Sequence, residues 1–91
     1  MKDKINEIVN YYGIIPQVKY WQSEVFELNE AIIKGECKDL NEEAINHIAE
    51  EIADNYVFLL QFMEYYKIDK EKIFSIIEYK VNRQIERISK E

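Results

Sequence analysis

The 91-residue sequence contains very little cysteine, glycine or proline. Its single cysteine, Cys37, excludes an intrachain disulfide and a cysteine-based zinc cluster, and we interpret it as an incidental loop thiol. Two glycines and one proline leave no glycine-rich or linker-like segment, whereas glutamate, lysine and isoleucine are abundant. Isoleucine recurs at steps of three and four residues rather than alternating, so the sequence predicts an all-α protein.

Basic charge and long apolar runs are also scarce. A formal net charge of −6 argues against a nucleic-acid backbone as partner, because neutralising phosphates requires a basic stripe. The negative charge does not exclude a free nucleotide as a ligand, since a metal ion can reverse the local sign of charge. No apolar run approaches the length of a membrane span, and the first residues, MKDKINEI, are not typical of a signal peptide. We therefore expect a cytoplasmic protein with no nucleic-acid and no membrane partner.

The apolar pattern predicts one domain, residues 1–91, built from four helices. The helices are expected at about 2–12, 16–34, 41–66 and from 69 onward. Gly13 and Gly35 are the expected stop signals of the first two helices, and Asn41 and Asp69 are the expected N-caps of the last two. A domain this small has a marginal core unless it oligomerises, so we also expect a homo-oligomer.

The second and third predicted helices each carry two stripes of residues at helical spacing. The apolar stripe of 16–34 contains Val18, Trp21, Val25, Leu28 and Ile32, and its neighbour contains Gln17, Tyr20, Glu24, Glu27 and Ala31. The apolar stripe of 41–66 contains Ile45, Ile48, Ile52, Tyr56, Leu59 and Met63, and its neighbour contains His47, Glu51, Asp54 and Phe58. We expect the apolar stripes to form the core and the acidic stripes to form a polar site with an aromatic edge.

Two acidic pairs, Glu24/Glu27 and Glu51/Asp54, have i,i+3 spacing, which places both carboxylates of each pair on one helix face. With a rise of 1.5 Å per residue and a turn at 35–40, Glu24 and Glu51 each lie about 15 Å from the turn. An antiparallel hairpin therefore brings the two pairs level. Carboxylates gathered in this way need a counter-ion, and hard oxygen ligands suit Mg²⁺ or Mn²⁺.

The order of these motifs resembles the all-α nucleoside triphosphate pyrophosphohydrolases, in particular small MazG-like proteins of bacteria and phages. The resemblance rests on ExxE at Glu24–Glu27, EEIAD at Glu50–Asp54 and KxxR at Lys80–Arg83, and it covers roughly residues 11 to 88. It implies a MazG fold resembling a four-helix bundle and a homodimer or homotetramer. It also implies Mg²⁺-dependent hydrolysis of a nucleoside triphosphate at the α–β bond, giving monophosphate and pyrophosphate for house-cleaning or control of nucleotide pools.

The resemblance also implies roles for individual residues. Metal ligation would fall to Glu24, Glu27, Glu51 and Asp54. Glu24 would in addition orient or deprotonate the attacking water, as the catalytic carboxylate. Substrate binding would fall to Gln17, at the base or sugar, and to Lys80 and Arg83, at the departing pyrophosphate. Two positions depart from the family pattern. Ser23 stands where many relatives carry an acidic residue, which leaves the number of metal ions open. Asn55 stands where an aliphatic residue is common.

Other interpretations of the sequence stay open. Phosphoribosyl-ATP pyrophosphohydrolases share the fold and the acids, and a non-catalytic helical adaptor would keep the bundle alone. The acids taken singly are also compatible with a solvated helix face. His47 is interpreted as exposed or as supporting a ligand, and Trp21 as packing rather than stacking on a base. A di-iron carboxylate site is excluded, because Ala44 stands where Glu should precede His47.

Overall fold

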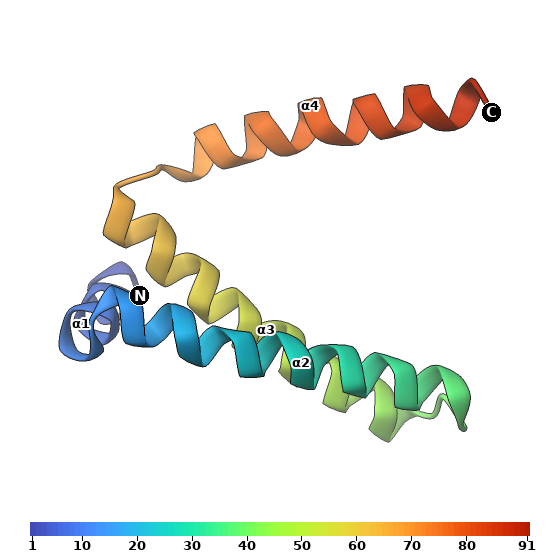
Figure 1. Cartoon of the computed structure of the whole chain (residues 1–91), viewed down its shortest axis with the longest axis horizontal. Coiled ribbons are helices and arrows are strands. Elements are labelled where there is room, and N and C mark those ends of the chain that lie inside the picture. The colour runs from blue at the N-terminus through green and yellow to red at the C-terminus, as the bar shows by residue number, and fades with distance from the viewer.

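The computed structural model describes all 91 residues and consists of four helices without strands. The helices are α1 (Lys2–Tyr12), α2 (Ile14–Cys37), α3 (Glu42–Tyr66) and α4 (Lys70–Ser89), as labelled in Figure 1. The prediction of an all-α chain with four helices is thereby confirmed. None of the helices combines the length and the apolarity that crossing a membrane requires.

Local sequence signals set most of the helix ends. The side-chain oxygen of Asn41 accepts a hydrogen bond from the N–H of Ala44 at 2.8 Å, and that of Asp69 accepts one from the N–H of Lys72 at 3.0 Å. Both predicted N-caps are therefore confirmed. Gly13 has a φ of 91°, a backbone conformation that favours glycine, and it alone separates α1 from α2. The chain changes direction there without a loop.

Gly35, in contrast, does not end a helix. α2 continues through it to Cys37, and Gly35 is buried. A Cβ atom at this position would lie 3.1 Å from Cδ1 of Leu40 and 3.3 Å from Cδ1 of Ile48. The prediction of a stop at Gly35 was wrong because the glycine here permits the end of α2 to pack closely on the turn and on α3.

The junction between α3 and α4 is a Schellman motif centred on Lys67, whose φ of 56° and ψ of 42° are left-handed. The N–H of Ile68 donates to the carbonyl of Met63 at 2.9 Å, and the N–H of Lys67 donates to the carbonyl of Glu64 at 3.3 Å. Only Ile68 separates Lys67 from the N-cap Asp69, so α4 starts at once in a new direction (Figure 1).

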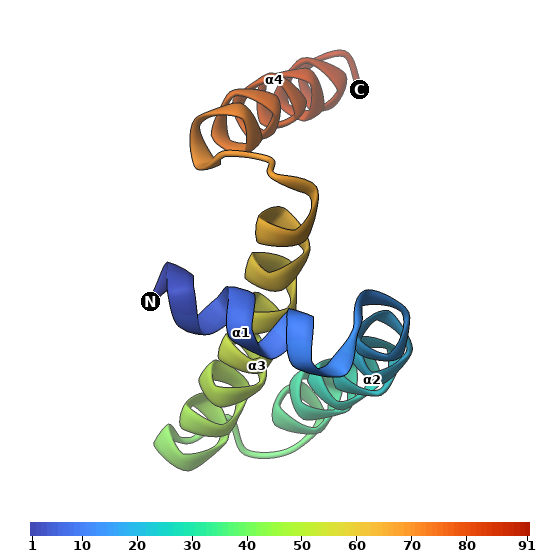
Figure 2. The same ribbon diagram turned by 90° about the vertical axis from the view of Figure 1, so that its left-hand side faces the viewer.

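α2 and α3 form an antiparallel hairpin, and α1 crosses both helices at the end away from the hairpin turn (Figures 1 and 2). The buried apolar residues are Ile5 and Val9 of α1, Phe58 of α3, and Ala31 near the end of α2. α4 extends away from the other helices and buries none of its residues. Within one chain, therefore, three helices pack together and the fourth stands apart.

The face of α3 that packs on α2 is not the expected one. Asn55, Phe58 and Gln61 are the buried residues of α3. Four members of the predicted core stripe are instead exposed by 41–61%, namely Ile45, Ile52, Tyr56 and Leu59. The core prediction for these residues was wrong because both stripes of α3 have helical spacing, and periodicity alone does not show which stripe meets the neighbouring helix in the same chain.

Candidate metal centre

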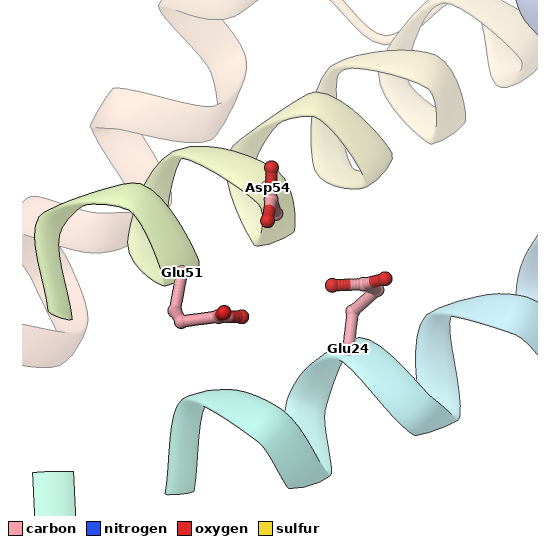
Figure 3. A group of neighbouring side chains, drawn as sticks. All are labelled: Glu24, Glu51 and Asp54. Carbon is pink, nitrogen blue, oxygen red and sulfur yellow. The ribbon is translucent and has the colours of Figure 1, made fainter. Parts of the chain in front are cut away.

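Three of the predicted metal ligands meet in the space between α2 and α3. Glu24 extends from α2 toward Glu51 and Asp54 of α3 (Figure 3). One carboxylate oxygen from each residue lies within 4.8 Å of the others. Two oxygen ligands of one ion are at most about 4.2 Å apart around Mg²⁺ and about 5 Å apart around Ca²⁺, so Mg²⁺ would draw the carboxylates slightly closer together. The spacing therefore suits a single divalent ion.

Two carboxylate oxygens of this group have no partner in the protein. Oε2 of Glu24 and Oε2 of Glu51 are shielded from solvent and accept no hydrogen bond. Nε2 of His47 lies 4.0 Å from Oε1 of Glu51, a contact that is an ion pair only when the imidazole is protonated. The His47 side chain is 59% exposed and the Glu51 side chain is 12% exposed. Shielded carboxylate oxygens without donors are unfavourable, and a bound cation would supply the missing interaction.

The electrostatics of Glu24 reflect this crowding. Its pKa is raised above the ordinary value of 4.5, first because it is desolvated and then because of the negative charges of Glu27, Asp54 and Glu51. A hydrogen bond with Glu27 acts in the same direction. Burial and like charges both disfavour an ionised carboxyl, so without a cation the site resists the full ionisation of Glu24.

Glu27, the fourth predicted ligand, stands beside the group rather than in it. Its side chain is exposed, and it is not among the carboxylates that lie within 4.8 Å of one another. Its charge and its hydrogen bond nevertheless affect Glu24. Glu27 therefore belongs to the rim of the site, on the same face of α2 as Glu24.

The predicted substrate-binding residues do not join the carboxylates within one chain. The side-chain amide of Gln17 donates to Oε1 of Gln61 at 2.9 Å and is thus engaged between α2 and α3. Lys80 and Arg83 lie on α4, apart from the hairpin (Figure 1). The guanidinium carbon of Arg83 lies 5.6 Å from the centre of the Tyr79 ring. The roles of these three residues stay predictions.

Asn55 is the residue at this site that sequence reasoning left without a role. Its Nδ2 donates to the backbone carbonyls of Glu24, at 3.1 Å, and Glu51, at 2.9 Å. Its Oδ1 accepts a hydrogen bond from Nε1 of Trp21 at 3.0 Å. One signal was present in the sequence: Asn55 follows Glu51 by four residues and therefore shares its helix face.

Aromatic rings lie next to the carboxylates, along the same two helix faces. Tyr20 stacks on Phe58 with ring centres 5.7 Å apart, and Trp21 meets Phe62 edge-on at 5.4 Å. Tyr20 precedes Glu24 by one turn and is 59% exposed. The sequence-based expectation of a polar site with an aromatic edge agrees with this arrangement.

Comparisons of the chain with known protein families, with curated proteins and with solved structures give no match. Its class is therefore defined by its own fold and site. The chain is an all-α protein in which two antiparallel helices bring three carboxylates together, at a position suited to a divalent cation.

Proposed function

We propose that this protein is a Mg²⁺-dependent nucleoside triphosphate pyrophosphohydrolase that also accepts Mn²⁺ and serves house-cleaning or control of nucleotide pools. The observation that carries the proposal is the meeting of Glu24, Glu51 and Asp54 within 4.8 Å, with shielded, unpaired Oε2 atoms on both glutamates. The resemblance of the ExxE, EEIAD and KxxR motifs to MazG-like proteins supports the same reaction.

The residues present are suited to this chemistry. Cleavage of a phosphoanhydride depends on charge neutralisation and positioning more than on covalent catalysis. A bound divalent ion would bind phosphate oxygens and lower the pKa of a water molecule beside them. The water oxygen bonds to one phosphorus of the α–β bridge, and the bond between that phosphorus and the bridging oxygen breaks. The bridging oxygen leaves on the other phosphate group, and one proton of the water passes to a base.

Glu24 is the base in this proposal. Its place in the ExxE motif supports this assignment, and in the metal-free site burial and the neighbouring carboxylates raise the pKa of Glu24 above 4.5. Asp54 and Glu51 are its partners in holding the ion, and Glu27 at the rim is a further ligand or a support for Glu24. The substrate would be a nucleoside triphosphate, with Gln17 toward its base or sugar.

A second copy of the chain is part of the proposed enzyme. α4 exposes an apolar stripe with no neighbour in its own chain, formed by Ile77, Val81, Ile85 and Ile88. Most of the stability of a helix in a protein comes from packing its apolar face against a neighbour. α4 also has five basic and three acidic residues in a chain of net charge −6, so it complements an acidic hairpin.

We propose a homodimer or a homotetramer in which α4 of one copy packs on another copy. In such an assembly, Lys80 and Arg83 would approach the carboxylates of a neighbouring copy, where they would offset the charge of the departing pyrophosphate. The exposed apolar residues of α3, Ile52 and Tyr56, would become part of the interface.

The first test is release of pyrophosphate from a panel of standard and modified nucleoside and deoxynucleoside triphosphates. Each reaction is run with Mg²⁺, with Mn²⁺ and with EDTA. We expect metal-dependent release of pyrophosphate together with the monophosphate, and the relative rates would identify the preferred base and sugar. Release of phosphate in place of pyrophosphate would contradict cleavage at the α–β bond.

A metal titration distinguishes the remaining interpretations if the panel gives no activity. A cation that binds only the folded state raises the melting temperature as its concentration passes Kd. An inactive protein that is stabilised by millimolar Mg²⁺ or Mn²⁺ would next be assayed with phosphoribosyl-ATP. An inactive protein with no stabilisation by metal would favour the non-catalytic adaptor and overturn the proposed function.

A further inference from the structure

The side-chain amide of Asn55 joins the two helices at the carboxylate site itself. Asn55 is 9% exposed and directly follows Asp54 on α3. The two backbone carbonyls to which it donates belong to Glu24 on α2 and to Glu51 on α3, which are both proposed metal ligands. No other side chain of the protein hydrogen-bonds to the backbone of two members of the carboxylate group.

We propose that Asn55 is a positioning residue, which fixes the separation and register of α2 and α3 where they hold the metal, and that Trp21 fixes the orientation of its amide. The inference rests on the proposed function in that it takes Glu24 and Glu51 as ligands. It assigns a role to the position at which this chain departs from the aliphatic residue of MazG-like proteins.

Both donors of the Asn55 amide and one lone pair of its Oδ1 are used by this arrangement. A carboxamide nitrogen has two N–H groups, and both donate to carbonyl oxygens. The carboxamide oxygen accepts from the indole of Trp21. A substrate contact made by the amide nitrogen would break one of these buried bonds, which argues against Asn55 as a donor to the substrate and for a fixed structural connection between the ligand-bearing helices.

Trp21 determines which way the amide points. Its indole nitrogen is only a donor, so it pairs with Oδ1 of Asn55 and leaves Nδ2 toward the two carbonyls. With the amide reversed, the NH₂ group of Asn55 would face the N–H of Trp21. Its Oδ1 would then face the carbonyl oxygens of Glu24 and Glu51, and neither contact is a hydrogen bond. Trp21 lies one turn before Glu24 and Asn55 lies one turn after Glu51, so their bond joins the two helices beside the carboxylates, on the side away from the hairpin turn.

A second amide pair in the same seam offers a matched control. Gln17 donates to Gln61 across α2 and α3 at 2.9 Å, and Gln61 is 1% exposed. Gln61 donates to the carbonyl of Val57, in its own helix, and contacts no backbone group of a proposed ligand. Removal of this amide should therefore weaken the hairpin without changing the spacing of the carboxylates.

The experiment compares Mn²⁺ binding to the full chain and to the variants Asn55→Leu, Trp21→Phe and Gln61→Leu by calorimetry, with helicity and melting temperature measured in EDTA. Loss of a residue that supports a metal ligand typically weakens affinity about 10- to 100-fold, and we expect a loss in that range for Asn55→Leu. Trp21→Phe, which keeps the ring but loses the N–H, should give a smaller loss. Gln61→Leu should stay within about 2-fold of the unmodified chain while melting earlier.

The outcomes separate this inference from the proposed function. An unmodified chain that binds no Mn²⁺ overturns the metal site and, with it, the inference. An unmodified chain that binds Mn²⁺, with unchanged affinity in Asn55→Leu, overturns the positioning role alone. Equal losses in Asn55→Leu and Gln61→Leu also overturn it, because they would show a general effect of weakening the seam. If Asn55→Leu fails to fold, Trp21→Phe decides: reduced affinity supports the role and unchanged affinity overturns it.

Discussion

The α2–α3 hairpin and the single helix α4 distribute polar and apolar residues in opposite ways. The hairpin buries the amides of Asn55 and Gln61 at its seam, whereas α4 exposes its apolar stripe and buries none of its residues. Polar contacts within the chain thus determine how the carboxylates are placed, while the apolar face of α4 has no neighbour in the chain. The difference indicates that contacts within one chain place the carboxylates, and the exposed stripe of α4 is the basis of the proposal that α4 packs on another copy.

The largest expected effect concerns the hairpin. Glu51→Gln removes a negative charge from the three-carboxylate group but keeps the size of the side chain. Loss of a mere supporting residue costs about 10- to 100-fold in metal affinity or activity, so loss of a ligand should reduce pyrophosphate release at least about 100-fold. The measurement is the rate of pyrophosphate release in Mg²⁺, together with helicity by circular dichroism, which should stay near that of the unmodified protein.

Glu43→Gln is the matched control for Glu51→Gln. It makes the same substitution two turns earlier on α3, at an exposed residue outside the three-carboxylate group. We expect little change in activity. If Glu51→Gln loses its fold together with its activity, Glu51 has a structural role. That result would contradict its assignment as a metal ligand that the fold does not need.

The next largest effect concerns α4 and assembly. The double substitution Ile77→Lys with Ile85→Lys places two charges in its exposed apolar stripe. Because buried unpaired charges are strongly unfavourable, the assembly should dissociate to a monomer of 11.0 kDa. The measurement is the molar mass in solution by light scattering, with Mn²⁺ binding as a test that the hairpin is intact.

Ser75→Lys with Tyr79→Lys controls for the added charge, since these residues lie about 125° and 165° from the centre of the apolar stripe at 100° per residue. This variant should keep the mass of the unmodified protein. If the unmodified chain is already monomeric, the contrast between the hairpin and α4 does not hold, because the apolar face of α4 then has no partner in another copy.

A smaller effect is expected from pH in the absence of metal. Burial and then the neighbouring carboxylates raise the pKa of Glu24, so the folded protein binds this proton more tightly than the unfolded chain. The resulting stability is complete below the ordinary pKa of 4.5 and is lost as the pH rises through the raised pKa. In EDTA, the melting temperature of the unmodified protein should therefore fall over this window relative to Glu24→Gln, which has no such proton to lose.

Saturating Mg²⁺ should reverse this dependence, because the ion competes with the proton for the carboxylate. Equal slopes of melting temperature against pH in the unmodified chain and in Glu24→Gln would contradict the raised pKa. The α4 lysine variants should keep the slope of the unmodified chain, since the affected groups all lie on the hairpin.

The smallest effect is expected at the turn of the hairpin, for Gly35→Ala. Alanine is favoured over glycine in a helix by about 1 kcal/mol, but its Cβ would lie 3.1 Å from Leu40 and 3.3 Å from Ile48. Leu40 is 48% exposed and can rotate away, so we expect a net gain in the free energy of unfolding of less than about 1 kcal/mol. Urea denaturation measures it. Gly35→Leu should instead destabilise by about 1–3 kcal/mol through overpacking.

The features predicted correctly from the sequence depend on short-range rules. The N-caps Asn41 and Asp69 and the break at Gly13 are determined by residues within one turn of each position. The level placement of Glu24 and Glu51 follows from the constant rise of a helix, which needs no knowledge of packing.

The features that the sequence did not predict depend on which surfaces meet. Ile52 and Tyr56 form an apolar stripe of the kind that usually packs in a core, yet they are exposed in the single chain. The residue spacing of an apolar stripe is the same whether the stripe packs on a helix of the same chain or on another chain. Asn55 could not be assigned for a related reason: its role depends on carbonyl groups of two helices, and backbone groups leave no pattern in a sequence.

The Schellman motif at Lys67 has a consequence for how such a chain can evolve. A single residue, Ile68, separates the left-handed residue Lys67 from the N-cap Asp69. The backbone conformation of residues 67–69, the elbow, therefore sets the direction of α4. A substitution or insertion at the elbow would redirect the whole helix without altering any residue of its apolar stripe. In the proposed assembly, substitutions at Lys67, Ile68 or Asp69 would therefore change the number and arrangement of copies while the stripe and the carboxylates stay the same.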